Sequence, residues 1–294
     1  MELRDIFLAQ GLNPTDIAVL FHVSDKPKLH KALPMLAEQE PDLFDAFQNQ
    51  HGPQVEATLK KRKFIATFVN VAANDYTYSG LFEVTGSHFQ TMAELDADPR
   101  RVLLQQRYDD TVFADLGRQT GQAGRLVFAL EPRAETADLI GRLMVAKPVA
   151  NRNYRFLADN LDCPIVEIAR HRQLVPPPPD WREFVVSADE LRSLPRNWAA
   201  RLAGWRGVYL ITDARDGARY VGAAYGVENL LGRWRAHVAR EKGVTAELRQ
   251  RSTSAFRFSI LQLLLHDADA SEVQALEANW KLRLHTREWG LNRN

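Results

Sequence analysis

The first part of the chain, residues 1–60, carries apolar positions at helical spacing. Lys28–Glu38 and Asp42–Gln48 repeat apolar residues every three or four positions, as helices with one buried face do. Pro34, Pro41 and Pro53 interrupt this pattern, and we expect each of them to break a helix. The pattern predicts that residues 1–60 are helical.

The pattern changes from helical to strand-like after residue 60. Lys63–Val71 and Thr77–Thr85 are rich in aromatic and β-branched residues and flank a turn-forming segment, which predicts a β-hairpin. Further strands are predicted at three places: Gly124–Leu130, Arg142–Ala146 and Cys163–Ala169. Residues 1–173 are therefore predicted to form an α+β domain with a small antiparallel sheet or barrel.

Four consecutive prolines, Pro176–Pro179, mark the clearest boundary in the chain. They favour an extended conformation and offer no amide donors to a helix or a sheet. A semi-rigid spacer is one interpretation, and a recognition ligand for another domain is the alternative. Residues 174–204 are taken as a proline-rich linker followed by a short strand and a helix that lead into a C-terminal domain.

The C-terminal domain is predicted to open with a hairpin. Two β-type runs, Gly207–Thr212 and Gly217–Gly222, flank a polar turn. If residues 213–216 form the loop, Thr212 lies opposite Gly217, and Tyr209 lies opposite Tyr220. Both phenol rings then project from one face, where they serve either as packing residues or as part of a site.

Two helices are predicted to follow this hairpin. The first, Asn229–Glu241, has Arg233 and His237 four residues apart, so both side chains can reach one ligand. The second is expected to begin at a capping box, Ser271–Gln274. Its apolar stripe comprises Val273, Leu276, Trp280 and Leu284.

Glu277 falls on the apolar face of this last helix. A carboxylate at the edge of a core is costly to desolvate unless a cation or hydrogen-bond donors satisfy it. A metal site and a structural salt bridge to an arginine both meet that need.

In order and spacing, these pieces resemble the GIY-YIG nuclease family over residues 205–294. Gly207-Val208-Tyr209 stands where the family has GIY, and Tyr220-Val221-Gly222 stands where it has YIG. The other positions that match family residues are Arg233, His237, Glu277 and Asn292. The resemblance implies an α/β-sandwich nuclease domain that hydrolyses phosphodiester bonds in DNA.

The resemblance also implies a role for each of these side chains. Glu277 is expected to hold one Mg²⁺ or Mn²⁺, and Arg233 to bind a non-bridging phosphate oxygen. Tyr209 is expected to take a proton from the attacking water, helped by a nearby cation or by His237. Tyr220 is expected to orient phosphate or water, and Asn292 to give a supporting hydrogen bond near the glutamate.

Charge and composition fit this division of the chain. Residues 205–294 contain 14 Lys and Arg against 10 Asp and Glu, which gives +4, and the other residues contain 24 against 27, which gives −3. The single cysteine excludes an internal disulfide, and the longest aliphatic run is far too short to span a membrane. We expect a cytoplasmic protein with no membrane segment and with DNA as its partner.

Three functions remain open on sequence alone. The first is a restriction or defence endonuclease in which residues 1–173 select the DNA. The second is a structure-selective nuclease of repair, recombination or a mobile element, and the third is a non-catalytic DNA-binding module. One active site cuts one strand, so a double-strand break requires two sites, for example in a homodimer on DNA.

The predicted N-terminal hairpin offers one hypothesis for DNA selection. Its strands resemble those of PUA-like and EVE-like domains, small barrels that bind modified bases. Strand alternation places most of its aromatic residues in the core, but one or two at a barrel mouth could stack on an extruded base. These residues are Phe64, Phe68, Tyr76, Tyr78 and Phe82. Protein binding or dimerisation is the alternative role of this domain.

Overall fold

The computed structural model divides the chain into two compact units, Met1–Pro176 and Pro177–Asn294. It describes residues 1–72, 74–113, 123–148, 153–225, 229–241, 246–264 and 268–293. The division falls within the proline run Pro176–Pro179. In the described ranges, no helix is long and apolar enough to cross a bilayer.

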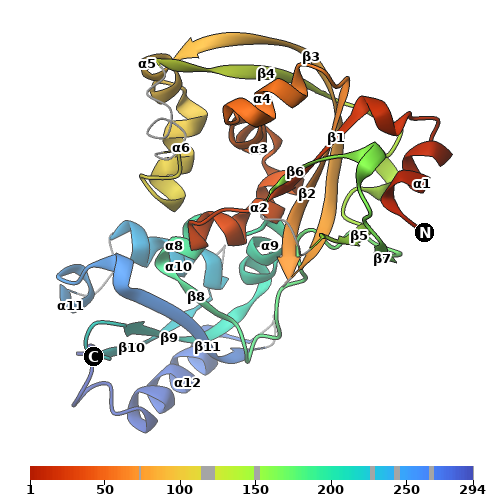
Figure 1. Ribbon diagram of the computed structural model, residues 1–294. Coiled ribbons are helices and arrows are strands. Elements are labelled where there is room, and N and C mark those ends of the chain that lie inside the picture. The colour runs from red at the N-terminus through yellow and green to blue at the C-terminus, as the bar shows by residue number, and fades with distance from the viewer. Residues whose placement is uncertain are drawn as a thin grey trace. The chain divides into compact units, whose positions relative to one another are not determined.

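The first unit is built on a mixed sheet whose described strands number seven (Figure 1). Their order is β6-β1-β2-β3-β5-β7, and β4 pairs with the outer part of β3. The strands are β1 (Ile17–His22), β2 (Phe64–Ala72), β3 (Asp75–Thr91), β4 (Gly124–Pro132), β5 (Leu143–Ala146), β6 (Arg155–Leu157) and β7 (Ile165–Ile168). The predicted hairpin is confirmed as β2 and β3, which pair antiparallel.

The prediction that residues 1–60 are helical is wrong at β1. All six residues of this strand are buried, because helices and turns cover both faces of the sheet. Ile17, Val19 and Phe21 join one apolar cluster, and Ala18 and Leu20 join another. A strand buried on both faces is a continuous apolar run without alternation. β1 also pairs parallel with β2, so the sheet is not purely antiparallel.

Helices pack around this sheet. They are α1 (Leu3–Ala9), α2 (Pro27–Gln39), α3 (Pro41–Gln48), α4 (Pro53–Leu59), α5 (Met92–Asp96) and α6 (Pro99–Tyr108). Pro41 and Pro53 begin helices rather than break them, since the first helical residue needs no amide donor. Pro34 lies inside α2, which continues past it.

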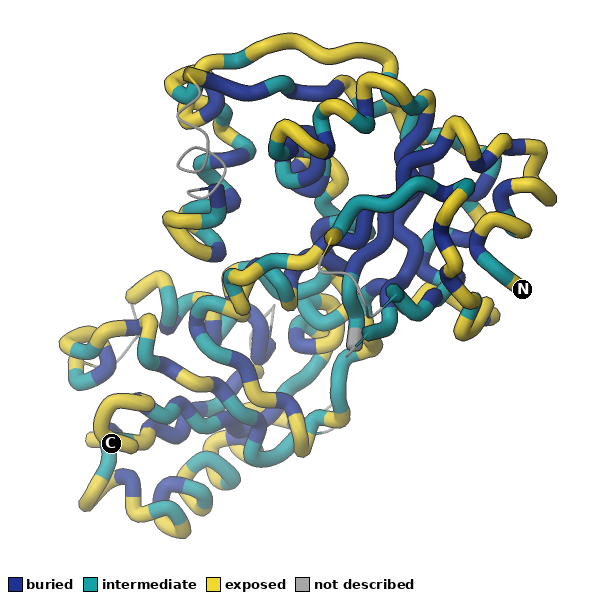
Figure 2. Tube along the Cα trace, viewed as in Figure 1, coloured by how far each residue is buried: buried dark blue, intermediate teal, exposed yellow. Residues whose placement is uncertain are grey.

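The outer part of β3 forms a two-stranded arm with β4, and α5 follows at its end (Figure 1). Much of the arm is exposed, whereas β1 and the inner part of β2 are buried (Figure 2). Four of the five aromatic residues considered for base stacking, Phe64, Phe68, Tyr76 and Tyr78, are at most 7% exposed. Only Phe82 is half-buried, so this hairpin offers no open stacking platform.

The second unit contains an antiparallel sheet of order β10-β9-β11-β8, flanked by helices. The strands are β8 (Val185–Ser187), β9 (Arg206–Asp213), β10 (Arg219–Ala224) and β11 (Phe256–Leu264). The helices are α8 (Ala188–Arg192), α9 (Arg196–Gly204), α10 (Asn229–Ala239), α11 (Ala246–Arg249) and α12 (Ala270–Arg283). β8 pairs with β11, and residues 185–204 belong to this unit.

Trp234 anchors the core of the second unit. Its indole is fully buried on α10 and contacts the rings of Phe184, Tyr209 and Phe258. The predicted apolar stripe of α10 is therefore a core stripe. Arg233 and His237 lie on the adjoining part of the same helix surface, beside the tyrosines of the β9–β10 hairpin.

Candidate active site

The β9–β10 hairpin has a register two residues away from the predicted one. Tyr209 pairs with Gly222 and Tyr220 pairs with Ile211, because the loop spans residues 214–217 instead of 213–216. Gly217 adopts a positive φ of 75° and its amide donates to the Asp213 carbonyl at 2.8 Å, which closes the turn one residue later. A shift of two residues keeps both tyrosines on one face.

Gly222 allows the ring of Tyr209 to lie across the neighbouring strand. A Cβ atom at this position would stand 2.4 Å from the Tyr209 hydroxyl oxygen and 2.9 Å from the Tyr220 ring. Any side chain here would push both tyrosines away. The glycine of the Tyr220-Val221-Gly222 motif thus has a direct steric function in the site.

Tyr209 and His237 form a buried hydrogen-bonded pair. The Tyr209 hydroxyl lies 2.7 Å from Nε2 of His237, and the two residues are 0% and 1% exposed. Burial raises the pKa of Tyr209 well above its usual range. Burial, with a smaller contribution from Arg233, lowers the pKa of His237 to about 3. At neutral pH the tyrosine is protonated and the histidine is neutral.

Arg233 interacts with the hydroxyls of both Tyr209 and Tyr220 from α10. Burial raises the pKa of Tyr220, and the Arg233 charge acts against that rise. The guanidinium itself is only partly buried. It therefore sits between the buried tyrosine hydroxyls and solvent, where a phosphate could reach it.

Glu277 lies on α12 at the edge of the same group. Its carboxylate acts electrostatically on both Tyr209 and Tyr220, and its side chain is 19% exposed. The helix begins earlier than predicted, because the capping box is formed by Asp269 and Glu272. Only Val273 of the predicted stripe is buried, while Leu276, Trp280 and Leu284 are half-buried.

Lys281 is the site residue that sequence reasoning missed. Its Nζ lies 2.9 Å from Oε1 of Glu277, and its side chain is only 6% exposed. The partner of Glu277 in the structure is thus a lysine one helical turn away, not an arginine. The spacing of four residues was the available signal.

Asn292 pairs with the backbone of β10. Its side-chain Oδ1 accepts from the Val221 amide and its Nδ2 donates to the Val221 carbonyl, each at 2.9 Å. The residue is fully buried. Both hydrogen bonds go to the residue next to Tyr220, so Asn292 holds the C-terminal segment against the hairpin.

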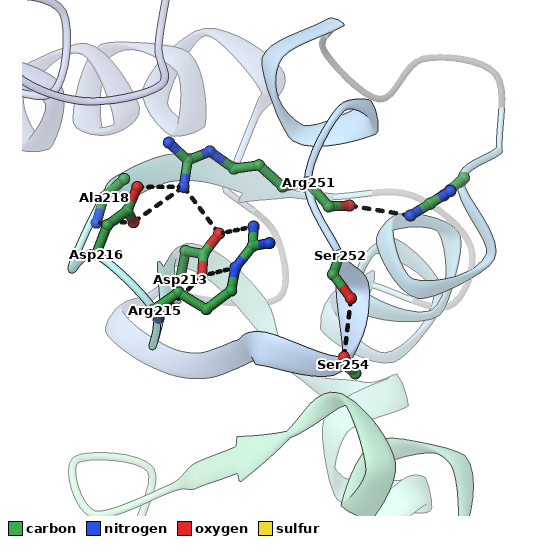
Figure 3. Close-up of polar contacts among 8 residues, drawn as sticks. Asp213, Arg215, Asp216, Ala218, Arg251, Ser252 and Ser254 are labelled. Atoms are coloured by element: carbon green, nitrogen blue, oxygen red, sulfur yellow. Dashed lines mark hydrogen bonds and ion pairs between the residues drawn. The ribbon is translucent and has the colours of Figure 1, made fainter.

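A separate charged network fixes the hairpin turn (Figure 3). The buried carboxylate of Asp213 accepts hydrogen bonds from Arg215 and Arg251, and Arg251 also pairs with Asp216. The Arg215 hydrogen bond, with a further one from Arg251, lowers the pKa of Asp213 well below its usual range. Both arginines are already paired with carboxylates, so we assign this network a structural role.

The residues present fit a hard divalent cation with few protein ligands. No group of three or more His, Cys, Asp or Glu side chains that could enclose a metal occurs in the described ranges. Mg²⁺ commonly takes one or two carboxylates and keeps several waters. Glu277 is a partly exposed carboxylate, which suits that mode.

Comparison with known proteins agrees with this geometry. The GIY-YIG catalytic domain family matches residues 206–292, and no curated protein matches the chain. A solved structure of the catalytic domain of intron endonuclease I-TevI, in a mutant form, is similar at 20% identity and a TM-score of 0.26. That match covers 31% of this chain and 94% of the other. Residues 206–292 therefore form a GIY-YIG catalytic domain, and the match does not extend to the rest of the chain.

Proposed function

We propose that the protein is a divalent-metal-dependent DNA endonuclease of the restriction or defence type. The observation that carries this proposal is the grouping of Tyr209, Tyr220, Arg233 and His237 around one buried hydrogen bond, with Glu277 at its edge. Phosphodiester hydrolysis needs phosphate binding, charge neutralisation and a proton acceptor. These side chains supply candidates for all three.

Arg233 is proposed to bind a non-bridging oxygen of the scissile phosphate. Its planar, permanently charged guanidinium suits that geometry better than an ammonium does. In the structure the Arg233 guanidinium interacts with both tyrosine hydroxyls. If it rotated toward a phosphate, the hydroxyls of Tyr209 and Tyr220 would become accessible. Substrate binding would thereby give the attacking water access to a buried acceptor.

Tyr209 and His237 are proposed to relay the proton of the attacking water. The water's proton would pass to the Tyr209 oxygen as the phenol proton leaves for Nε2 of His237, 2.7 Å away. The raised pKa of Tyr209 and the pKa of His237 near 3 make a standing phenolate–imidazolium pair unfavourable. The two transfers must therefore be coupled.

Glu277 is proposed to hold Mg²⁺ or Mn²⁺. Bound there, the cation would supply positive charge for the phosphate and lower the pKa of a coordinated water. Lys281 already neutralises this carboxylate. The lysine and the cation would thus compete for Oε1 of Glu277.

The first unit is proposed to select the DNA. A catalytic domain of this size with a small charge excess has little surface for specificity, and Met1–Pro176 is a compact unit of its own. A double-strand break would need two copies of the chain on the DNA, or two successive cuts.

A cleavage screen tests this function. The full chain is incubated with plain, methylated, hydroxymethylated and branched DNA in the presence of Mg²⁺ or Mn²⁺. We expect metal-dependent cleavage that prefers a linear duplex, with or without base modification, over branched DNA. Preference for branched DNA would instead indicate a structure-selective nuclease, and no cleavage of any substrate would contradict the proposal.

A further inference from the structure

Four consecutive polar residues are buried in the first unit. They are Gln48, Asn49, Gln50 and His51, which connect α3 to α4, and each is at most 5% exposed. Loop residues of this kind are normally found at the surface. Their burial requires a structural or functional reason.

Other buried polar side chains surround this segment. His22, at the end of β1, is 4% exposed and is electrostatically coupled to His51. Gln50 accepts a hydrogen bond from Arg101 of α6, which is 1% exposed. The cluster thus joins β1, the α3–α4 connection and α6.

Part of the cluster's hydrogen-bonding capacity is unused. Six buried atoms make no hydrogen bond of acceptable geometry with the described residues: His22 Nε2, Gln48 Oε1, Gln48 Nε2, Asn49 Oδ1, His51 Nε2 and Arg101 Nε. Buried polar groups are nearly always hydrogen-bonded, because leaving them unsatisfied destabilises the fold. So many in one place point to a missing partner molecule.

The chemistry of the cluster favours a neutral partner. Burial lowers the pKa of His22 to about 3 and that of His51 to about 4, so both rings are neutral at pH 7. The Arg101 charge is already engaged by Gln50 and by Asp96, 3.5 Å away. No free charge remains among these residues to bind a phosphate or a carboxylate.

Flat side chains frame the two histidines. The rings of Phe44 and Phe47 lie 5.6 and 5.5 Å from the His22 ring. Those of Phe128 and Tyr154 lie 6.4 and 6.1 Å from the His51 ring. Sites that combine aromatic rings with amide and imidazole groups commonly bind planar heterocycles, which stack on the rings and hydrogen-bond to the polar groups.

We propose that His22, Gln48, Asn49 and His51 form a binding site for a nucleobase. The Gln48 amide would donate and accept along one edge of the base, as amides do with adenine. The six unused atoms are closed to solvent, so the base enters by separating these side chains. If the protein acts on DNA as proposed above, the base is one extruded from the duplex, and otherwise it is a free nucleoside.

Gln48→Leu tests the site, because a ligand site and a structural cluster predict opposite effects on stability. Leucine has nearly the volume of glutamine. It removes two buried atoms that make no hydrogen bond of acceptable geometry, together with the interaction of Gln48 with His22, which is the smallest of the influences on that histidine. The melting temperature, followed by far-ultraviolet circular dichroism, should stay the same or rise. Binding should weaken about tenfold or more, as expected for two lost hydrogen bonds. Gln54→Leu, the same change at an exposed position of α4, should leave binding unchanged.

Binding of the full chain is measured by calorimetry without divalent metal. The probes are the deoxynucleosides with standard, methylated and hydroxymethylated bases, and otherwise identical duplexes that contain each base. Binding only to duplexes identifies an extruded base, and binding to free nucleosides identifies a small-molecule site. His22→Phe, which removes another unused atom, is the second variant if Gln48→Leu does not fold.

The proposal is overturned if no probe binds, if both variants bind every probe as the wild type does, or if both variants lower the melting temperature. Because the measurement needs no cleavage, the nucleobase site can fail while the nuclease stands. The reverse also holds, since binding of free nucleosides would persist in a chain without nuclease activity.

Discussion

At the scale of single residues, the candidate active site contains a tyrosine and a histidine whose pKa values are shifted so that neither ionises at neutral pH. Tyr209 and His237 share one short hydrogen bond, and burial keeps the first protonated and the second neutral. At neutral pH the pair is therefore uncharged, with the Arg233 guanidinium beside it.

Tyr209→Phe tests the proton relay, since it retains the ring and its packing but deletes the hydroxyl. Loss of a general base typically costs about 10² to 10⁴-fold in rate. We expect a fall of that size in single-turnover cleavage. Tyr225→Phe is the matched control, because Tyr225 is 40% exposed and its hydroxyl accepts a long hydrogen bond of 3.4 Å from Gln274. Equal rates for both variants would assign Tyr209 to packing alone.

Lys281→Met tests the competition between lysine and cation at Glu277. At short range, two like charges near a protein surface repel by about 1 to 4 kcal/mol. Removing the ammonium 2.9 Å from the carboxylate should therefore tighten Mn²⁺ binding about tenfold, as followed by electron paramagnetic resonance. Lys60→Met, at an exposed lysine, should have no effect. Weaker or unchanged Mn²⁺ binding in a folded Lys281→Met chain would argue against competition.

At the scale of elements, a single amide joins the end of the chain to the catalytic hairpin. Asn292 fills both hydrogen-bonding groups of Val221 on β10, as a neighbouring strand would. The side chain therefore extends the sheet edge beside Tyr220. Its role is to hold the hairpin in place.

Asn292→Ala should destabilise the second unit by about 2 to 4 kcal/mol, because it leaves a buried amide and a buried carbonyl unsatisfied. All six tryptophans lie between Trp181 and Trp289, so tryptophan fluorescence during urea denaturation reports on this unit alone. Asn279→Ala, at an exposed position of α12, serves as the control. A midpoint equal to that of the control would show that the two hydrogen bonds contribute little.

Helical spacing of apolar residues predicted α2, α3, α10 and α12, and a high content of aromatic and β-branched residues predicted the β2–β3 hairpin. β1 was missed because it is buried on both faces. The β9–β10 register was missed because the conformation of Gly217 decides where the turn closes.

The motif residues Tyr209, Tyr220, Arg233 and His237 lie together in the structure, but the sequence did not predict the partners of Glu277 and Asn292. The Lys281 ion pair with Glu277 and the Asn292 hydrogen bonds to Val221 depend on side-chain packing. The four-residue spacing permits the Glu277–Lys281 pair but does not specify it, and no spacing rule predicts the Asn292 contact. The buried polar cluster of the first unit likewise comes together from β1, the α3–α4 connection and α6.

At the scale of the whole molecule, the two units can be followed independently. Met1–Pro176 contains no tryptophan. A change in circular dichroism without a change in tryptophan fluorescence therefore reports on the first unit.

The first unit should lose stability in mild acid. An unfolded histidine binds its proton near pH 6.5, whereas folded His22 and His51 do so only near pH 3 and 4. Below about pH 6.5 the unfolded state binds more protons, so stability present at pH 7 is lost progressively as the pH falls toward 4. The urea midpoint of the first unit, followed as the change in circular dichroism that tryptophan fluorescence does not report, should be lower at pH 4.5 than at pH 7. His22→Phe should reduce that fall, and an equal pH dependence in the wild type and this variant would contradict the assignment.

The central claim is that the second unit cuts DNA with a cation held by Glu277. The most direct measurement is the nicking of supercoiled plasmid by the full chain and by its Glu277→Ala variant, across a Mg²⁺ and a Mn²⁺ titration. Glu288→Ala, at an exposed glutamate of the same unit, is the matched control. We predict metal-dependent nicking by the wild type and the control, and none by Glu277→Ala at any metal concentration. Substantial nicking by a folded Glu277→Ala chain, or nicking by the wild type that survives removal of all divalent metal, would contradict the claim.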